Sequence, residues 1–274
     1  MLRRLAANPL TVAGAVIVVL LFFIAAAAPW LAPWDPSDFD VKHVLEGPSR
    51  VHLLGTDGLG RDELARLIHG ARISLVVGLC APIIGLVIGG AFGMLAGYFR
   101  GRFGSLVVGS MDVLLAFPPL ILVLAIIAFL GQSIFNLTCI LGVLGIPAFM
   151  RVARATTLTL SRREFVIAAQ ALGASDSRIL LRELLPNVFL PLFAFFLLGV
   201  AVTIVVEGSL SFLGLGVPPP ISSWGSMIGE GRESLDVAPR LAFLPAIAMF
   251  LTVLAFNLIG DTLRALTDPR QGAL

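Results

Sequence analysis

Two carboxylates interrupt long apolar runs of this sequence, and such groups can do chemistry inside a membrane. Asp112 directly precedes the run that begins at Val113, and Glu207 separates two further runs. An ionised carboxylate in lipid is costly, so each is a functional candidate that would line a path or contact a substrate. The alternative, which we prefer, is a structural pair with a nearby cation such as Arg102 or Arg72. The two carboxylates lie towards opposite membrane faces, which argues against a catalytic pair.

Three histidines and two cysteines are the other residues with metal-binding or nucleophilic chemistry. His43, His52 and His69 lie in one polar segment, at separations that match no metal signature. Cys80 and Cys139 lie in apolar runs, and we expect both to be free thiols. No apolar run contains a histidine, so an intramembrane hydrolase is not expected. The sequence predicts neither a metal site nor a catalytic site.

The segment Gly55–Gly60 is the nearest approach to a nucleotide-binding loop. A P-loop ends in Gly-Lys-Ser or Gly-Lys-Thr, because the lysine must reach the phosphates. Here Arg61 and Asp62 follow the last glycine. We therefore expect no ATP or magnesium site in this chain.

Composition indicates the kind of structure that must position these residues. Of the 274 residues, 58% are hydrophobic and only 13% are charged, and the mean hydropathy is +0.99. An average soluble domain has roughly 25% charged residues. Such a composition excludes an ordinary soluble enzyme, a disordered chain and a nucleic-acid binder with a basic face. The chain is expected to be an all-α integral membrane protein.

Six apolar runs are long enough to cross a bilayer, which takes about 20 residues. The predicted spans are residues 9–30, 73–98, 105–130, 136–157, 187–212 and 241–263. This divides the chain into 1–72, a first span with a long external loop, and 73–274, a five-helix core. Arg3 and Arg4 before the first run also resemble a signal peptide, but that run is longer than a typical signal sequence.

The distribution of basic residues predicts the orientation. With the N-terminus inside, twelve of the nineteen basic residues fall in inner segments. The positive-inside rule therefore favours cytoplasmic N- and C-termini.

Four glycines in the second span recur every fourth residue, and they define one helix face: Gly85, Gly89, Gly93 and Gly97. Small residues at this spacing let two helix backbones approach closely in lipid. The alternative is that glycine is simply common in membrane helices. We favour a close contact between this glycine face and a second helix, which the sequence does not identify.

Residues 161–186 are too polar to span a membrane, yet they contain strong helix signals. Ser161 and Glu164 have the spacing of a capping box. An apolar stripe follows, made of Phe165, Ala168, Ala169 and Leu172. A short helix with a small-residue face fits a groove on another protein, or alternatively rests on lipid headgroups.

A glycine separates this first short helix from a second one. Gly173 can take the left-handed conformation that ends a helix. Ser175 or Asp176 can cap the second helix, which we expect to stop before Pro186. The segment is therefore predicted to be a helical hairpin at the cytoplasmic surface.

The hairpin resembles the cytoplasmic motif of ABC-importer permeases in the spacing of Ala168-Ala169, Gly173 and Leu185-Pro186. It departs from that motif at Ile167 and Glu183. Further matching stretches are His52–Asp57, Gly60–Asp62, Gly70–Leu75, Met111–Asp112, Phe117–Pro119, Ser209–Gly216, Trp224–Gly225, Asn257–Asp261 and Asp268–Arg270. From about Asn8 to Arg270 the chain resembles the C-type permease of dipeptide, oligopeptide and nickel importers.

This resemblance implies a type I permease fold in the bacterial plasma membrane and a conduit rather than an enzyme. It implies four kinds of partner: a second, related permease, two ATPase subunits or one fused ATPase, an external substrate-binding protein, and the lipid bilayer. ATP and magnesium would be bound by the ATPases. Coupling to them is assigned to Glu164, Phe165, Ala168, Ala169, Leu172, Gly173, Ala174 and Ser175.

The resemblance leaves the substrate open. Dipeptides or short oligopeptides are favoured over nickel or another small solute, and an ion-coupled secondary transporter is a more distant alternative. Residues 214–240 form a candidate external gate or a docking surface for the binding protein. There Trp224 is expected at the membrane interface and, with Asp112 and Glu207, is a candidate path or gate residue.

Overall fold

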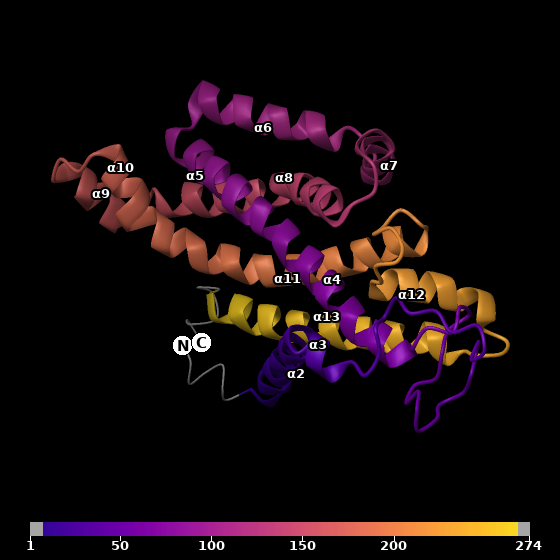
Figure 1. Cartoon of the computed structure of the whole chain (residues 1–274). Coiled ribbons are helices and arrows are strands. Elements are labelled where there is room, and N and C mark those ends of the chain that lie inside the picture. Colours follow the sequence, from indigo (N-terminus) through magenta and orange to yellow (C-terminus); the bar gives the residue numbers. More distant parts are fainter. Residues whose placement is uncertain (1–7, 268–274) are drawn as a thin grey trace.

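The computed structural model describes residues 8–267, and Arg3, Arg4 and the Asp268–Arg270 stretch lie outside this range. Within the described residues the regular elements are helices, and a single antiparallel bridge joins Thr56 and Asp62. The all-α fold predicted from composition is confirmed. Figure 1 shows long helices packed obliquely across one another.

Five helical stretches are long and apolar enough to cross a membrane. They are α2 (Pro9–Ala26), the continuous α4–η1–α5 (Glu63–Ile84, Gly85–Gly89, Gly90–Phe99), α8 (Ile134–Leu160), the continuous α10–η2–α11 (Asp176–Arg178, Ile179–Leu184, Leu185–Phe212) and α13 (Arg240–Thr267). A short α3 (Ala28–Leu31) follows α2. These stretches match five of the six predicted spans.

The remaining span, predicted at 105–130, is not one straight helix. It consists of α6 (Gly101–Leu115) and α7 (Pro119–Leu130), which meet at an angle of 79°. Pro118 and Pro119 explain the break, because proline cannot donate the helical hydrogen bond and disfavours helical geometry in the residue before it. By length and composition the bent pair has the features of a broken span or of a re-entrant loop.

Two helices begin well before the apolar runs that predicted them. α4 starts at Glu63, ten residues before the expected start at 73, where the Asp62 side chain accepts a hydrogen bond from the Ala65 amide at 2.7 Å. The second hairpin helix does not stop before Pro186 but continues into α11. The π-helical turns of Ile179–Leu184 precede this proline, and such turns commonly accompany distortions inside long helices.

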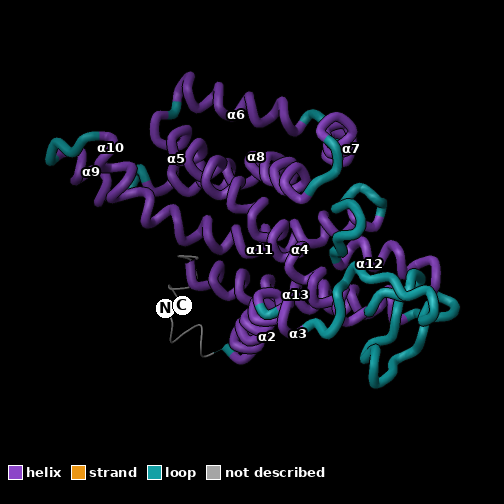
Figure 2. The backbone as a smooth tube through the Cα atoms, viewed as in Figure 1, coloured by secondary structure: helices purple, strands orange, loops and turns teal. Residues whose placement is uncertain are grey.

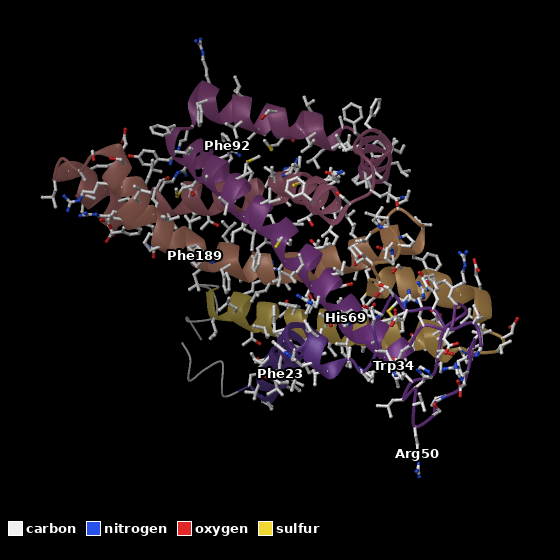
Figure 3. All side chains as sticks on the ribbon, viewed as in Figure 1. Phe23, Trp34, Arg50, His69, Phe92 and Phe189 are labelled. Atoms are coloured by element: carbon white, nitrogen blue, oxygen red, sulfur yellow. The ribbon has the colours of Figure 1, made fainter. Side chains whose placement is uncertain are left out.

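Loops and short helices gather at two opposite ends of the bundle. At one end lie α9 (Glu164–Ala171) and α10; at the other lie α12 (Trp224–Gly231), η3 (Arg232–Ser234) and the loop between α3 and α4 (Figure 2). In that loop Arg50 points away from the protein (Figure 3). A conformational change that links the two sides of a membrane would have to involve the helices between these ends.

α11 runs through the centre of the largest apolar cluster. Its Val200 and Ile204 are fully buried, with Phe149 of α8 and Phe256 of α13 in the same cluster. α2 packs along α13, where Thr11 Oγ1 and Thr262 Oγ1 share a 2.7 Å hydrogen bond. α11 therefore packs against both α8 and α13 at the centre of the bundle.

Candidate functional site

The helical hairpin is built around a glycine. Gly173 has φ +75°, its amide donates to the Gln170 carbonyl at 3.0 Å, and the Ala174 amide donates to the Ala169 carbonyl at 3.0 Å. This pattern is a Schellman motif, which uses a left-handed residue to satisfy the last carbonyls of a helix. The glycine therefore sets the direction in which the chain leaves α9.

The apolar stripe of α9 divides between two environments. Val166, which was not in the predicted stripe, is fully buried in a cluster with Met94 and Ile179, and Ala169 packs against that cluster. Phe165 and Leu172 are 39% and 88% exposed, and Ala168 is exposed as well. The hairpin is thus anchored by Val166 and Ala169, while Phe165, Ala168 and Leu172 form an uncovered apolar face.

The predicted capping of both hairpin helices is wrong in its details. Arg163 occupies the cap position of α9, and no side chain there accepts a bond. Ser161 instead donates to the Leu158 carbonyl and accepts from Arg100, because α8 and its final turn extend through it. Ser175 occupies the cap position of α10, but its hydroxyl bonds to the hydroxyl of Ser177 at 3.2 Å rather than to a first-turn amide.

A bond that the sequence did not indicate ties the hairpin to the bundle. The Tyr98 hydroxyl, at the end of α5, donates to Asp176 Oδ1 at 2.6 Å. From Asp176 the helix continues without interruption to Phe212. The hairpin is therefore continuous with α11 and is joined to α5 by this hydrogen bond.

The four glycines of the second span face α8. A Cβ at Gly89 would lie 2.5 Å from the Ile146 carbonyl oxygen, and one at Gly97 would lie 2.8 Å from the Arg154 carbonyl oxygen. Gly85 meets the Phe149 ring and Gly93 the backbone at Met150. The structure thus identifies α8 as the helix on the other side of the glycine face.

Asp112 and Glu207 occupy different environments, and neither has the cation that we expected. Asp112 accepts from Arg151 Nη2 at 2.8 Å, not from Arg102 or Arg72, because α6 lies beside α8. Glu207 is fully buried and bonds only to hydroxyls: Ser211 at 2.7 Å and Ser74 at 3.3 Å.

Trp224 lies in the protein core rather than at the membrane interface, where it was expected. It is 1% exposed, and its indole Nε1 donates to the Leu67 carbonyl at 3.1 Å. Its amide donates to Ser74 Oγ, the same hydroxyl that donates to Glu207. Together these bonds join α4, α11 and α12 at one buried point.

The loop before α4 contains an ion cluster to which we had assigned no role. Asp57 accepts from Arg61 Nε at 2.7 Å and from Arg66, and Glu230 of α12 accepts from both arginines, with Arg66 Nη2 at 2.9 Å. Burial alone raises the pKa of the Asp57 carboxyl, but Arg66 and Arg61 outweigh it and hold the pKa below its usual value. Asp57 and Arg61 belong to the Gly-Thr-Asp and Gly-Arg-Asp stretches of the sequence, in which we predicted no ion pair.

A cavity of about 940 Å³ opens beside this ion cluster. Its walls include Arg61 and Arg66 from the loop side, Gln132 before α8, and Phe212 and Pro220 from the segment that follows α11. Glu230 thus holds α12 against α4 at the rim of this cavity. The predicted gate segment 214–240 therefore contributes to a cleft at the end of the bundle opposite the hairpin.

We expect Asp57→Asn to lower the free energy of unfolding by about 3 kcal/mol, because two buried guanidinium groups lose one of their two shared carboxylates and keep only the half-exposed Glu230. The stabilisation by Asp57 is present above its normal pKa and is lost as the pH falls through the lowered value, that is, below about pH 4. Thermal unfolding in detergent measures both effects. Asp38→Asn, an exposed carboxylate in the same loop, is the control and should be nearly neutral.

Among residues 8–267, no three His, Cys, Asp or Glu side chains come together as a metal site would require. His52 instead bonds to Asp62 at 2.9 Å, and His43 to Asp40 at 2.7 Å. The features that remain are an uncovered hairpin at one end, a polar cleft at the other, and continuous helices between them.

Comparison with known proteins agrees with these features. A family model described as "Binding-protein-dependent transport system inner membrane component" matches residues 89–272, and one described as "N-terminal TM domain of oligopeptide transport permease C" matches residues 1–48.

Curated relatives match almost the whole chain. The "Glutathione transport system permease protein GsiD" of Pectobacterium atrosepticum is 41% identical over 269 residues, which is 98% of this chain and 89% of the relative. The protein of the same name from Escherichia coli O157:H7 is 43% identical over the same shares.

A solved structure shares the fold. A chain of the methionine ABC transporter MetNI, in an inward-facing conformation, aligns with a TM-score of 0.60 and 18% sequence identity, over 74% of this chain and 96% of that one. The resemblance to importer permeases and the type I permease fold are thereby confirmed. This chain belongs to the family of binding-protein-dependent transport system inner membrane components, as a multi-pass permease subunit of an ABC importer.

Proposed function

We propose that the chain forms half of a translocation path for short peptides, paired with a second, related permease. Two ATPase subunits, or one fused ATPase, bind nucleotide beneath the pair, and an external binding protein delivers the substrate. The chain itself carries no catalytic residue in this scheme. The observation that carries the proposal is the uncovered face of α9, which an integral membrane protein exposes next to a continuous 37-residue helix.

The exposed face fits a groove on an ATPase. Phe165 and Leu172 supply apolar contact area, and Ala168 between them permits close approach of the partner backbone. Coupling requires that the ATPase contact this face differently in its open and closed states. The Asp176–Phe212 helix then transmits the difference to the far end of the bundle.

The hairpin end is assigned to the cytoplasm in this proposal. Arg100, Arg102, Arg162 and Arg163 lie at this end, in agreement with the positive-inside rule. The opposite end, with the Asp57 ion cluster and α12, then faces outward, where it would contact the binding protein or gate the path.

The relatives support the proposed substrate class. They are named for glutathione, which is a tripeptide and so lies within the range of dipeptides and short oligopeptides. The competing proposal is nickel or another small solute, since importers of both classes share the sequence motifs noted above.

Uptake into vesicles that contain the assembled transporter tests this proposal. We expect accumulation of labelled glutathione or a dipeptide that requires both the binding protein and internal ATP. Inhibition by unlabelled short peptides but not by nickel supports the peptide class, and the reverse pattern contradicts it. Uptake by this chain alone, driven by a proton or sodium gradient, would contradict the whole scheme.

A further inference from the structure

A second cavity, of about 630 Å³, lies at the hairpin end of the bundle, between the start of α6 and the last turns of α8. Its lining is strongly basic: Arg100, Arg102 and Arg154 surround it, with Gly101, Gly104 and Ser105 from the first turns of α6. No carboxylate lines this cavity. The role proposed above for the hairpin makes no use of it.

The positive charge of this cavity is not neutralised by nearby acids. Asp112 of α6 is paired with Arg151, and Asp176 accepts from Tyr98. Arg154 Nε is buried and, among the described residues, has no hydrogen-bond partner. A buried guanidinium N–H without an acceptor is costly, so the site is suited to an anion that supplies one.

The other arginine-rich site in the described part of the chain is arranged differently. Arg61 and Arg66 are held by Asp57 and Glu230, so their charges are compensated inside the protein. At the hairpin end, Arg100 donates to the neutral hydroxyl of Ser161 and, within residues 8–267, forms no salt bridge. The contrast indicates that the basic cavity compensates its charge with a group from outside the chain.

Apolar side chains next to the cavity indicate where that group comes from. Phe99, Phe103 and Leu106 are 50%, 44% and 72% exposed, and the two rings meet edge to face at 6.3 Å between centroids. Phe99 is also the last residue of α5, at the end of a helical stretch that is long and apolar enough to cross a membrane. A phosphate in the cavity would place an attached acyl chain along this ridge.

We propose that the basic cavity between α6 and α8 binds a phosphate group, carried by an anionic phospholipid. Guanidinium groups bind phosphate oxygens through paired, charge-assisted hydrogen bonds, and three arginines line this cavity. Free inorganic phosphate offers the same chemistry but leaves the apolar ridge unused. The bound lipid would hold α6 against α8, the helix that leads directly into the hairpin.

Native mass spectrometry of the full chain tests this proposal. The protein, purified in a neutral detergent, is titrated with phosphatidylglycerol and, separately, with zwitterionic phosphatidylcholine. We expect a phosphatidylglycerol adduct that Arg102→Gln/Arg154→Gln weakens at least tenfold and that the corresponding lysine variant largely retains. Arg162→Gln removes a charge at the same end but outside the cavity lining, and should leave binding unchanged.

Two further arms make the outcome decisive. Ser105→Asp keeps every arginine but adds a carboxylate at the cavity wall, so it should also abolish the adduct even if the double variant fails to fold. Displacement of the lipid by millimolar inorganic phosphate would identify a site for free phosphate, and the absence of displacement identifies the lipid. Equal phosphatidylglycerol binding by wild type, Ser105→Asp and the double glutamine variant would overturn the proposal.

Discussion

Gly173→Pro is expected to reduce uptake about 100-fold while the protein still inserts into the membrane. Gly173 has φ +75° and its amide donates to the Gln170 carbonyl. Proline is restricted to φ near −65° and has no N–H, so the Schellman motif cannot form, at a cost of roughly 3 kcal/mol. About 3 kcal/mol corresponds to about two powers of ten in the population of the correct hairpin.

The surroundings of Gly173 make the result straightforward to interpret. A Cβ at this position would meet nothing within 4 Å, so the effect of a substitution comes from the backbone conformation and not from a clash. Gly173→Asn is the matched control, because asparagine tolerates the left-handed conformation and should retain most uptake. Substrate-stimulated ATP hydrolysis by the assembled complex is the second measurement. Normal stimulation in the proline variant would show that the hairpin is not the coupling element.

Periodicity and local signals predicted the parts of the fold that depend on neighbouring residues. Apolar runs located five straight spans, and the spacing around Gly173 predicted the end of α9. The same signals misplaced the start of α4, because its polar first turn at Glu63 is capped by Asp62 and lies outside the apolar run. Pro186 was interpreted as the end of the second hairpin helix because the π-helical turns before it cannot be detected in a hydrophobicity pattern.

The partners of charged residues could not be predicted from the sequence. Asp112 meets Arg151, which is 39 positions away, and Arg61 meets Glu230, which is 169 positions away. Such pairs depend on how helices pack, and periodicity carries no information about that packing. The direction of a side chain on α9 is a similar case, since only the tertiary structure separates anchored Val166 from exposed Phe165.

The glycine face of the second span gives the largest expected effect on stability. We expect Gly93→Leu to destabilise the protein by about 3 kcal/mol or more, because overpacked interfaces must shift backbone to admit a new side chain. A Cβ at Gly93 would already lie 2.8 Å from the Ala153 Cβ and 3.0 Å from the Arg154 amide nitrogen, and it would clash with the Met150 carbonyl. These are mostly backbone atoms of α8, which cannot rotate away as a flexible side chain would.

Helix propensity predicts the opposite outcome, which makes this variant informative. Leucine forms helices better than glycine by nearly 1 kcal/mol, so a loss of stability can come only from the α5–α8 contact. Gly109→Leu on α6 is the control, because a Cβ there meets nothing within 4 Å and the residue is exposed. Thermal unfolding in detergent should place Gly93→Leu well below wild type and Gly109→Leu at or above it. Equal stability of the two variants would mean that α5 and α8 do not meet along this face.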